Sequence, residues 1–314
     1  MEPAVDNDAP PTDPTLPLNE RVSSVLRQLA ARPLAAGLYT VATPIGNLGD
    51  ITLRALATLE KADCIYCEDT RHSRTLLQHF GINRPLRPYH EHNAEKERPR
   101  ILAELAQGKV IALISDAGTP LISDPGYKLV REAAAAGHFV TSLPGASAVT
   151  MALALAGLPT DAFLFAGFLP PRMAARKARL AELAHVPATL VLFEAPQRLQ
   201  ETLEDLCTVM GAREAVVARE LSKLHEEARR GTLAELLEWS KASTPRGEMV
   251  ILVAPGAQGV ASDEDIAARI TQLLDEMSVR DAAKAAAESF GIPKGRAYDM
   301  ALRLKQATRV RDDD

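Results

Sequence analysis

Apolar and polar positions alternate along the first half of the chain in a way typical of strands separated by helices. Short apolar runs that end in polar, Gly- or Pro-containing turns predict strands at residues 38–43, 62–67, 110–114 and 138–143. Apolar residues at helical spacing predict helices at residues 51–59, 73–80, 101–107, 127–136 and 148–156. Because strands alternate with helices, we expect a parallel sheet with crossover helices, forming an N-terminal α/β domain over residues 37–157.

The pattern changes near residue 157, where strands become fewer and their connections less regular. Strands are predicted at residues 163–165, 188–193, 215–219 and 249–253, and helices at 172–184, 199–210 and 233–239. This spacing favours a second α/β domain over residues 158–255, with a mixed sheet rather than a purely parallel one.

The C-terminal part of the chain has the pattern of helices only. Helical segments at 263–277, 279–290 and 296–305 predict a helical domain over residues 262–308. The second and third segments are joined by a short turn, which is the layout of a helix-turn-helix. Such a unit binds nucleic acid in some proteins and serves as a capping or dimerising bundle in others. Its basic residues, Lys294 and Arg296 among them, favour nucleic acid.

Residues 1–36 precede the first predicted strand, and their first twenty are acidic and rich in proline. They carry too little apolar surface to offset the entropy of ordering, so we expect a disordered or weakly ordered extension with one short helix at 21–31. The segment lacks the basic and apolar regions of a signal peptide. No apolar run approaches the roughly 18 residues that span a bilayer, so we expect a cytoplasmic protein with no membrane partner.

Length and composition agree with this organisation. The chain has 314 residues, of which 46% are hydrophobic, enough for two domains with sizeable cores. The net charge is −5, so a nucleic-acid partner requires a local basic surface. Cys64 and Cys67 form a C-x-x-C inside a predicted strand, where they point to opposite faces. We therefore expect buried, reduced thiols rather than a zinc or redox site.

Three polar loops mark the carboxyl ends of predicted strands, where open α/β sheets bind ligands. They are PIGNLGD at 44–50, SDAGTP at 115–120 and PGAS at 144–147. In the second loop Gly118 allows close approach of a ligand and Asp116 supplies a hydrogen-bond acceptor. Neither a G-x-G-x-x-G opening a helix nor a P-loop occurs in the sequence, which disfavours nicotinamide-dinucleotide and P-loop nucleotide chemistry.

Charged residues cluster after two other strands. One cluster is Glu68, Asp69, Arg71 and His72, and the other is Glu220, Lys223 and His225. Each is either a structural ion-pair network or part of a site. Residues 84–100 and 172–179 are locally basic, as solvated faces or as nucleic-acid contacts. The histidines show no metal-ligand spacing, and no metal is expected.

Several motifs together resemble a known family. The runs VATPIGNLGDITLRAL, EDTRHSRTLL, YHEHN, ALISDAGTPLISDPGYKLV, PGASAV, FAGFLP, FEAPQR and RGEMV occur in the family's order over roughly residues 38–308. In these the chain resembles the bacterial 16S ribosomal RNA cytidine 2'-O-methyltransferases of the tetrapyrrole methylase superfamily. The resemblance implies a two-domain α/β fold that binds S-adenosylmethionine between its domains.

The resemblance also implies where the cofactor lies. The residues expected around S-adenosylmethionine are Pro44, Gly46, Ser115, Asp116, Ala117, Gly118 and Ser147. Relatives that methylate tetrapyrroles have a first loop richer in glycine than residues 43–46 here, which favours the RNA branch.

For methyl transfer to a ribose 2'-hydroxyl, the enzyme must align the reacting atoms and help to remove a proton. We expect Glu68 or Asp69 to accept that proton, and Arg71 and Lys223 to hold phosphate or stabilise the alkoxide. Contacts to 16S ribosomal RNA, or to the small ribosomal subunit, are expected from His90, His92, Asn93, Arg98, Lys294 and Arg296.

Two other functions stay open. One is methylation of a tetrapyrrole precursor, which superfamily membership favours and the basic segments oppose. The other is a non-catalytic regulator that binds S-adenosylmethionine and contacts nucleic acid through its C-terminal helices. A homodimer is expected only because the superfamily forms dimers.

Overall fold

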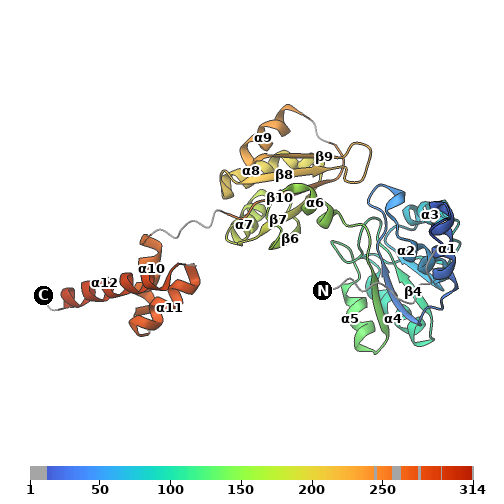
Figure 1. Ribbon diagram of the computed structural model, residues 1–314, viewed down its shortest axis with the longest axis horizontal. Coiled ribbons are helices and arrows are strands. Elements are labelled where there is room, and N and C mark those ends of the chain that lie inside the picture. The colour runs from blue at the N-terminus through green and yellow to red at the C-terminus, as the bar shows by residue number, and fades with distance from the viewer. Residues whose placement is uncertain (1–12, 244–245, 257–262, 275–276, 291, 313–314) are drawn as a thin grey trace.

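The computed structural model describes residues 13–243, 246–256, 263–274, 277–290 and 292–312. Two five-stranded sheets follow each other along the chain, and a cluster of three helices follows them (Figure 1). The α/β class, with a parallel first sheet and a mixed second one, is confirmed.

The first sheet is parallel throughout, with strand order β3-β2-β4-β1-β5. Its strands are β1 (Gly37–Val41), β2 (Cys64–Cys67), β3 (Leu86–Pro88), β4 (Val110–Leu113) and β5 (Phe139–Leu143). Because all strands run the same way, the loops after β1, β2, β4 and β5 open at one edge of the sheet. The sequence did not predict β3, which has only three residues and ends in a proline.

Helices cover both faces of this sheet. They are α2 (Leu53–Lys61), α3 (Thr70–His79), α4 (Ala94–Ala106) and α5 (Tyr127–Ala135). Apolar residues of α2 and α3 pack on one face, and those of α4 and α5 on the other. Cys67 lies in the first of these cores and Cys64 in the second, both buried and unbonded, as the alternation of a strand predicts.

The N-terminal extension differs from its prediction in the second half. Residues 1–12 lie outside the described residues, so disorder there stays a prediction. The expected helix is present and longer than predicted, as α1 (Leu18–Ala31). It packs against α2, and Lys61 Nζ donates to the carbonyl oxygen of Leu29 at 2.9 Å. These contacts hold in place a segment that composition alone marked as weakly ordered.

The second sheet has the order β6-β7-β10-β8-β9, and only its β6–β7 pair is parallel. The strands are β6 (Phe163–Phe168), β7 (Thr189–Glu194), β8 (Glu214–Arg219), β9 (Glu227–Thr232) and β10 (Met249–Val253). The sequence missed β9, because its residues EARRGT are mostly charged and polar. As an edge strand it pairs with β8 alone and needs no apolar run.

Helices α7 (Met173–Ala184), α8 (Leu199–Met210) and α9 (Leu233–Ala242) pack on one face of this sheet. The other face is covered by α6 (Ala148–Ala156), whose Val149, Ala152 and Leu153 contact residues of β7, β8 and β10. The predicted domain bounds place residues 148–156 in the first domain. In the structure this helix follows β5 of the first sheet and packs on the second sheet. It therefore joins two units, each formed by one sheet and the helices on it (Figure 1).

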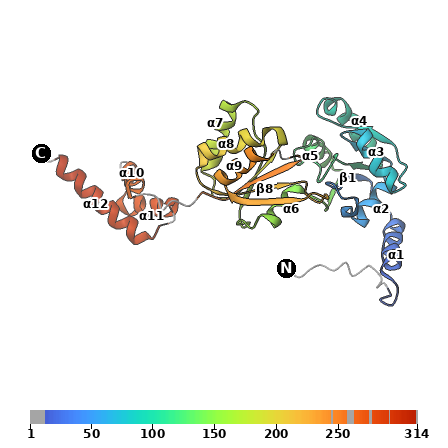
Figure 2. The same ribbon diagram turned by 90° about the horizontal axis from the view of Figure 1, so that it is seen from above.

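The last helices are α10 (Asp263–Leu274), α11 (Val279–Phe290) and α12 (Lys294–Asp312). They share a small core of their own, formed by residues such as Ile266, Ala286 and Ala301. Both views show α12 extending beyond α10 and α11 toward the C-terminus (Figures 1 and 2). Residue 262, the predicted start of this domain, lies outside the described residues, and the domain bounds stay predictions.

No helix among the described residues has the length and apolar character needed to cross a bilayer.

Candidate active site between the two sheets

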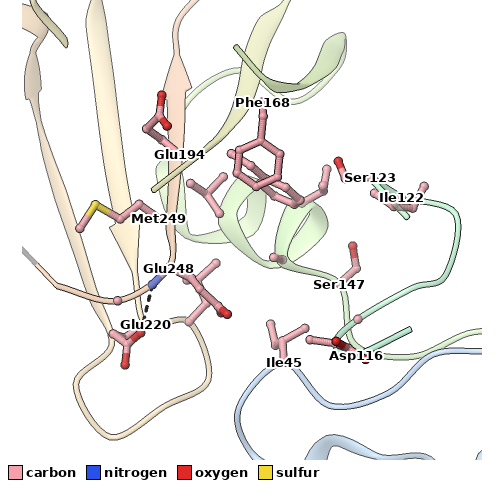
Figure 3. Close-up of a pocket in the computed structure, with 18 of the residues that line it drawn as sticks. Ile45, Asp116, Ile122, Ser123, Ser147, Phe168, Glu194, Glu220, Glu248 and Met249 are labelled. Atoms are coloured by element: carbon pink, nitrogen blue, oxygen red, sulfur yellow. Dashed lines mark hydrogen bonds between the residues drawn. The ribbon is translucent and has the colours of Figure 1, made fainter. Parts of the chain in front are cut away.

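A cavity of about 600 Å³ lies where the loops of the first sheet meet strand ends of the second (Figure 3). The loop after β4 and the first turn of α6 form one side. The ends of β6, β7 and β10 and the β8–β9 loop form the other. The volume is in the usual range for small-molecule sites, and both units are needed to enclose it.

The loops of the first sheet are fixed to one another beneath this cavity. Thr43 and Gly118 exchange two backbone hydrogen bonds, at 2.9 and 3.0 Å. Thr119 Oγ1 donates to the carbonyl oxygen of Ala146 at 3.2 Å. Gly118 has φ +77°, and a Cβ there would lie 3.3 Å from Ile45 Cγ2. The loop after β4 is therefore bound to both neighbouring loops, and glycine permits its backbone geometry.

The predicted cofactor residues fall into two groups. Asp116, Ala117, Gly118 and Ser147 line the cavity. Pro44, Gly46 and Ser115 do not belong to its lining. Ser115 is buried and its Oγ donates to the carbonyl oxygen of Ala117 at 3.2 Å, so it shapes the loop from within. Pro44 is buried next to Ile45, which lines the cavity in its place.

The first turn of α6 faces the cavity with Ser147, Ala148 and Val149. Ser147 is the N-cap residue, and its side chain makes no capping hydrogen bond to the helix. The first amide groups of a helix lack intrahelical partners and carry the positive end of the helix dipole. This wall of the cavity suits an anionic group such as a carboxylate.

The turn after β2 carries the predicted proton acceptors. Asp69 is the N-cap of α3, and its carboxylate accepts from the backbone and the guanidinium of Arg71. These hydrogen bonds lower the pKa of Asp69 to about 2. The side chain of Arg71 is 89% exposed. A carboxylate of such low basicity, already engaged in capping a helix, is a poor acceptor of a hydroxyl proton.

Glu68, Asp116 and Asp124 form a group of carboxylates that we call the strand-end carboxylates. Burial and the charge of Asp116 raise the pKa of Glu68. Burial and the charge of Glu68 raise the pKa of Asp124 to about 6. Asp116 and Asp124 line the cavity, and Asp116 Oδ1 accepts the backbone N–H of Asp69 at 2.9 Å. Asp116 thus connects the cavity wall to the turn that bears Glu68.

Asp124 was missing from the predicted site. It stands in the motif ISDPG directly after the loop at residues 115–120, but no feature of the sequence indicates that this segment folds back toward Glu68. The backbone makes this reversal through Leu121 and Ser123, both with positive φ values. A left-handed conformation at a leucine is rare, and it is not readable from composition.

The β8–β9 loop brings Lys223 to the site. Lys223 Nζ forms ion pairs with Glu220 at 3.1 Å and with Glu248 at 3.2 Å. Its aliphatic part lies against Gly46, where a Cβ would come within 2.3 Å of Lys223 Cγ. The hydroxyl of Ser222 also contacts the carboxylate of Asp50. The loop of the second unit therefore rests on the first loop of the first unit.

The part of the opposite side formed by the ends of β6 and β7 combines two phenylalanines with the carboxylate of Glu194. Phe168 is 57% exposed beside Phe193, with ring centroids 5.6 Å apart, and faces Ile122 and Ser123 across the cavity (Figure 3). Glu194, at the end of β7, is buried and accepts from Thr202 Oγ1 at 2.6 Å. These residues were not among the predicted site residues, although Phe168 lies in the motif FAGFLP and Phe193 and Glu194 lie in FEAPQR.

The predicted RNA contacts are spread over two regions and are not all free to bind. Asn93 is occupied in its own turn, since its side chain accepts the N–H of His90 at 2.9 Å and donates to the carbonyl of Pro88. The rings of His90 and His92 lie 6.0 Å apart. Arg98 is only 16% exposed and pairs with Glu132 at 2.9 Å. Lys294 is exposed at the start of α12, which also carries Arg296.

Two segments with basic sequences contribute less positively charged surface than the number of their arginines and lysines indicates. In residues 84–100, Arg87 pairs with the buried Glu104 and donates to Tyr66 Oη at 3.1 Å. In residues 172–179, Arg176 is buried and pairs with Asp205 at 2.6 Å. The expectation of a basic face is therefore wrong for Arg176, which turns inward because α8 supplies a carboxylate there. Across the described residues, no cluster of three or more His, Cys, Asp or Glu side chains could hold a metal.

Comparison with known proteins places this geometry in a family. Residues 37–237 match the family model described as Tetrapyrrole (Corrin/Porphyrin) Methylases, and residues 260–305 match one described as RsmI C-terminal HTH domain. Proteins named ribosomal RNA small subunit methyltransferase I are similar along most of the chain. The protein from Mesorhizobium japonicum is 50% identical over 283 residues, which are 90% of this chain and 96% of the relative. The protein from Pseudomonas aeruginosa is 49% identical over 275 residues, which are 85% of this chain and 97% of the relative.

Solved structures show the same fold at low identity. The crystallographic structure of cobalt precorrin-4 methyltransferase aligns with a TM-score of 0.53 and 18% identity, covering 69% of this chain and 94% of that one. At this identity the likeness concerns the fold alone.

Proposed function

The chain belongs to the tetrapyrrole methylase family, and from this premise we propose that it is an S-adenosylmethionine-dependent methyltransferase that modifies the 2'-hydroxyl of a cytidine in 16S ribosomal RNA. The observation that carries the proposal is the cavity between the sheets, lined by Asp116, Gly118 and Ser147 together with Lys223. The names of its relatives support RNA of the small ribosomal subunit as the substrate.

The cavity has the chemical features that this cofactor requires. The first turn of α6 suits the carboxylate of the methionine part, and Asp116 suits its ammonium group. The apolar wall with Phe193 and Met249 suits the adenine. Gly118 leaves room for close approach. When bound, S-adenosylmethionine supplies an activated methyl group that needs no metal ion.

In this mechanism the chain removes a proton and holds the reacting groups in line. Between the two predicted acceptors, the site favours Glu68, because its pKa is raised whereas that of Asp69 is lowered to about 2. A raised pKa makes Glu68 the better base once it is ionised. Asp69 then serves as the cap of α3, and its backbone is held by Asp116.

Lys223 and Arg71 are the cations at the site. Lys223 lines the cavity and has two carboxylate partners, whereas Arg71 extends into solvent beside Asp69. We assign phosphate contact to Arg71, because an exposed guanidinium binds phosphate at little desolvation cost. Lys223 is assigned to the charge that develops on the ribose oxygen. A homodimer and a cytoplasmic location stay predictions.

The deciding experiment is methyl transfer from labelled S-adenosylmethionine to three acceptors, each tested separately: assembled small subunits, naked 16S RNA and a porphyrinogen. We expect label in RNA or subunits, at a ribose that then resists alkaline cleavage of the adjacent phosphodiester. Label in the porphyrinogen alone would establish the tetrapyrrole alternative. Cofactor binding without transfer to any acceptor would favour a non-catalytic regulator.

A further inference from the structure

Helix α12 carries an exposed stripe that is separate from the cavity. Lys294, Tyr298, Leu302 and Lys305 follow one another at spacings of three or four residues, so they share one side of the helix. Tyr298 is 42% exposed and Leu302 is 37% exposed. We call these four residues the α12 stripe. A tyrosine and a leucine exposed between two lysines form an apolar patch with a positive charge at each end.

The core of the three helices does not use this stripe. Ala297 and Ala301 of α12 are fully buried and pack with Ile266 and Ala286 of the other two helices. Alanines at these positions let the helices approach closely, and the larger α12 side chains that pack beside them are Met300 and Leu304, not Tyr298 or Leu302. Tyr298 is therefore not needed to hold the cluster together.

Charge indicates what the stripe binds. Between residues 294 and 305, α12 has four cationic side chains and one carboxylate, Asp299. The first three residues of α10, Asp263 to Asp265, are all acidic. The positive charge of the cluster is thus concentrated on α12, which suits a polyanion.

The form of the polyanion follows from the shape of RNA. A helix-turn-helix reads DNA by placing a helix in the major groove, but the major groove of A-form RNA is too deep and narrow to admit one. Proteins that recognise RNA instead stack unpaired bases on aromatic side chains and contact the neighbouring phosphates with cations. Tyr298 with a lysine one turn before it has this arrangement.

We propose that the α12 stripe binds an unpaired nucleotide of the RNA substrate, with the base stacked on Tyr298 and the adjacent phosphates on Lys294 and Lys305. The proposal rests on the proposed function for the identity of the partner. It goes beyond that function in naming a second contact, remote from the cavity, which selects single-stranded over paired RNA.

The test is binding of the full chain to two labelled RNA probes, a mixed-sequence single strand and the blunt duplex of the same sequence, followed by fluorescence anisotropy. We expect Tyr298→Ala to weaken single-strand binding about ten-fold, and Tyr298→Phe to bind within about two-fold of the unchanged protein, because the ring is what stacks. Duplex affinity should be the same for all three proteins.

Tyr127→Ala is the matched control. Tyr127 is 59% exposed and lies on a different helix, α5, where its ring is next to Arg131. It should leave both affinities unchanged. Circular dichroism and the melting temperature establish that Tyr298→Ala is folded. If folded Tyr298→Ala binds the single strand as tightly as the unchanged protein, the proposal is overturned. It is also overturned if the variant changes the oligomeric state instead, because the stripe then contacts a second copy.

This result can be separated from the proposed function. If the unchanged protein transfers no methyl group to RNA but the tyrosine variants still differ in single-strand binding, the inference stands and the enzymatic proposal fails. If transfer occurs and the variants bind alike, the inference alone fails.

Discussion

Two groups of charged residues, one buried and one half-buried, differ in how their charges are balanced. In the second unit, Arg176 and Asp205 are 3% and 5% exposed and pair at 2.6 Å, with Lys177 as a further partner of Asp205. At the edge of the first sheet, burial together with the charges of neighbouring carboxylates raises the pKa of Glu68 and of Asp124, and Asp116 is one of these neighbours. One group has matched charges, whereas the other has three neighbouring carboxylates, with His90 as an opposing group near Glu68.

The difference separates charged residues that stabilise the fold from charged residues that can take part in a reaction. A matched buried pair satisfies its own hydrogen bonds and has no capacity left for a ligand. A half-buried carboxylate beside another carboxylate keeps its proton more tightly than usual, so that ionising it costs stability and its proton affinity becomes available for chemistry. In the sequence both groups are simply charged residues near strands and helices.

The largest expected effect is on the matched pair. Arg176→Met leaves Asp205 buried without its main partner, so the free energy of unfolding should fall by about 3–5 kcal/mol, measured by urea denaturation. The double variant Arg176→Met with Asp205→Leu should recover most of this loss, because no charge is then stranded. A loss well under 1 kcal/mol in the single variant would contradict the structural reading of this pair.

Replacing the strand-end carboxylate Glu68 should act on rate rather than stability. Glu68→Gln should lower kcat for methyl transfer by at least about 100-fold, since a positioned general base contributes that much. For the unchanged protein, kcat should rise with pH as Glu68 ionises, with a midpoint above the ordinary value for glutamate because its pKa is raised. The variant should have lost this rise.

Asp69→Asn is the comparison for that experiment, because it keeps a side chain that can cap α3. We expect it to retain most of the rate. The assignment of the proton acceptor fails if Glu68→Gln keeps full activity while it binds RNA normally.

Asp124→Asn should have a smaller effect, which is on the free energy of unfolding and depends on pH. The pKa of Asp124 rises from 3.8 to about 6 on folding, so ionising it opposes the folded state. Its contribution to stability is fully present below pH 3.8 and is lost as pH rises through about 6. The asparagine variant should therefore be more stable than the unchanged protein at pH 8, by about 1–2 kcal/mol, and equally stable at pH 3.5. Denaturation at the two pH values checks this, and equal stability at pH 8 would show that Asp124 is not strained by its neighbours.

Arg71→Ala should leave the melting temperature unchanged, because Arg71 is almost fully exposed. If it contacts phosphate, its loss weakens RNA binding several-fold and reduces the slope of log affinity against log salt by about one. Arg131→Ala, also exposed and on α5, is the control and should change neither quantity. An unchanged salt slope for Arg71→Ala would remove this residue from the site.

Much of the fold could be predicted because the first unit is locally consistent. Its apolar runs, such as 110–114, are continuous and end in polar turns, so strand positions and their parallel order followed from the alternation with helices. The edge strands β3 and β9 could not be predicted, since a strand with one neighbour requires little apolar sequence. The placement of α6 on the second sheet was also unreadable, because the helix is apolar on nearly every side.

The site was predictable in part for a related reason. Residues of one loop stay together in space, so Asp116, Ala117 and Gly118 were found as a group. Contacts between residues of different loops could not be predicted in this way. The proximity of Asp124 to Glu68 depends on positive φ values at Leu121 and Ser123, and the occupation of Arg98 and Arg176 depends on carboxylates of other helices. These are tertiary contacts that periodicity does not encode.

The contact between Lys223 and Gly46 also has an evolutionary consequence. A side chain at position 46 would collide with Lys223 Cγ at 2.3 Å, and Gly46 has φ +149°, which residues with a Cβ rarely adopt. Replacing this glycine therefore requires both a displaced Lys223 side chain and a backbone conformation that residues with a Cβ tolerate. Positions 46 and 223 are far apart in the chain but should vary together among descendants, because their contact joins the loops of the two sheets.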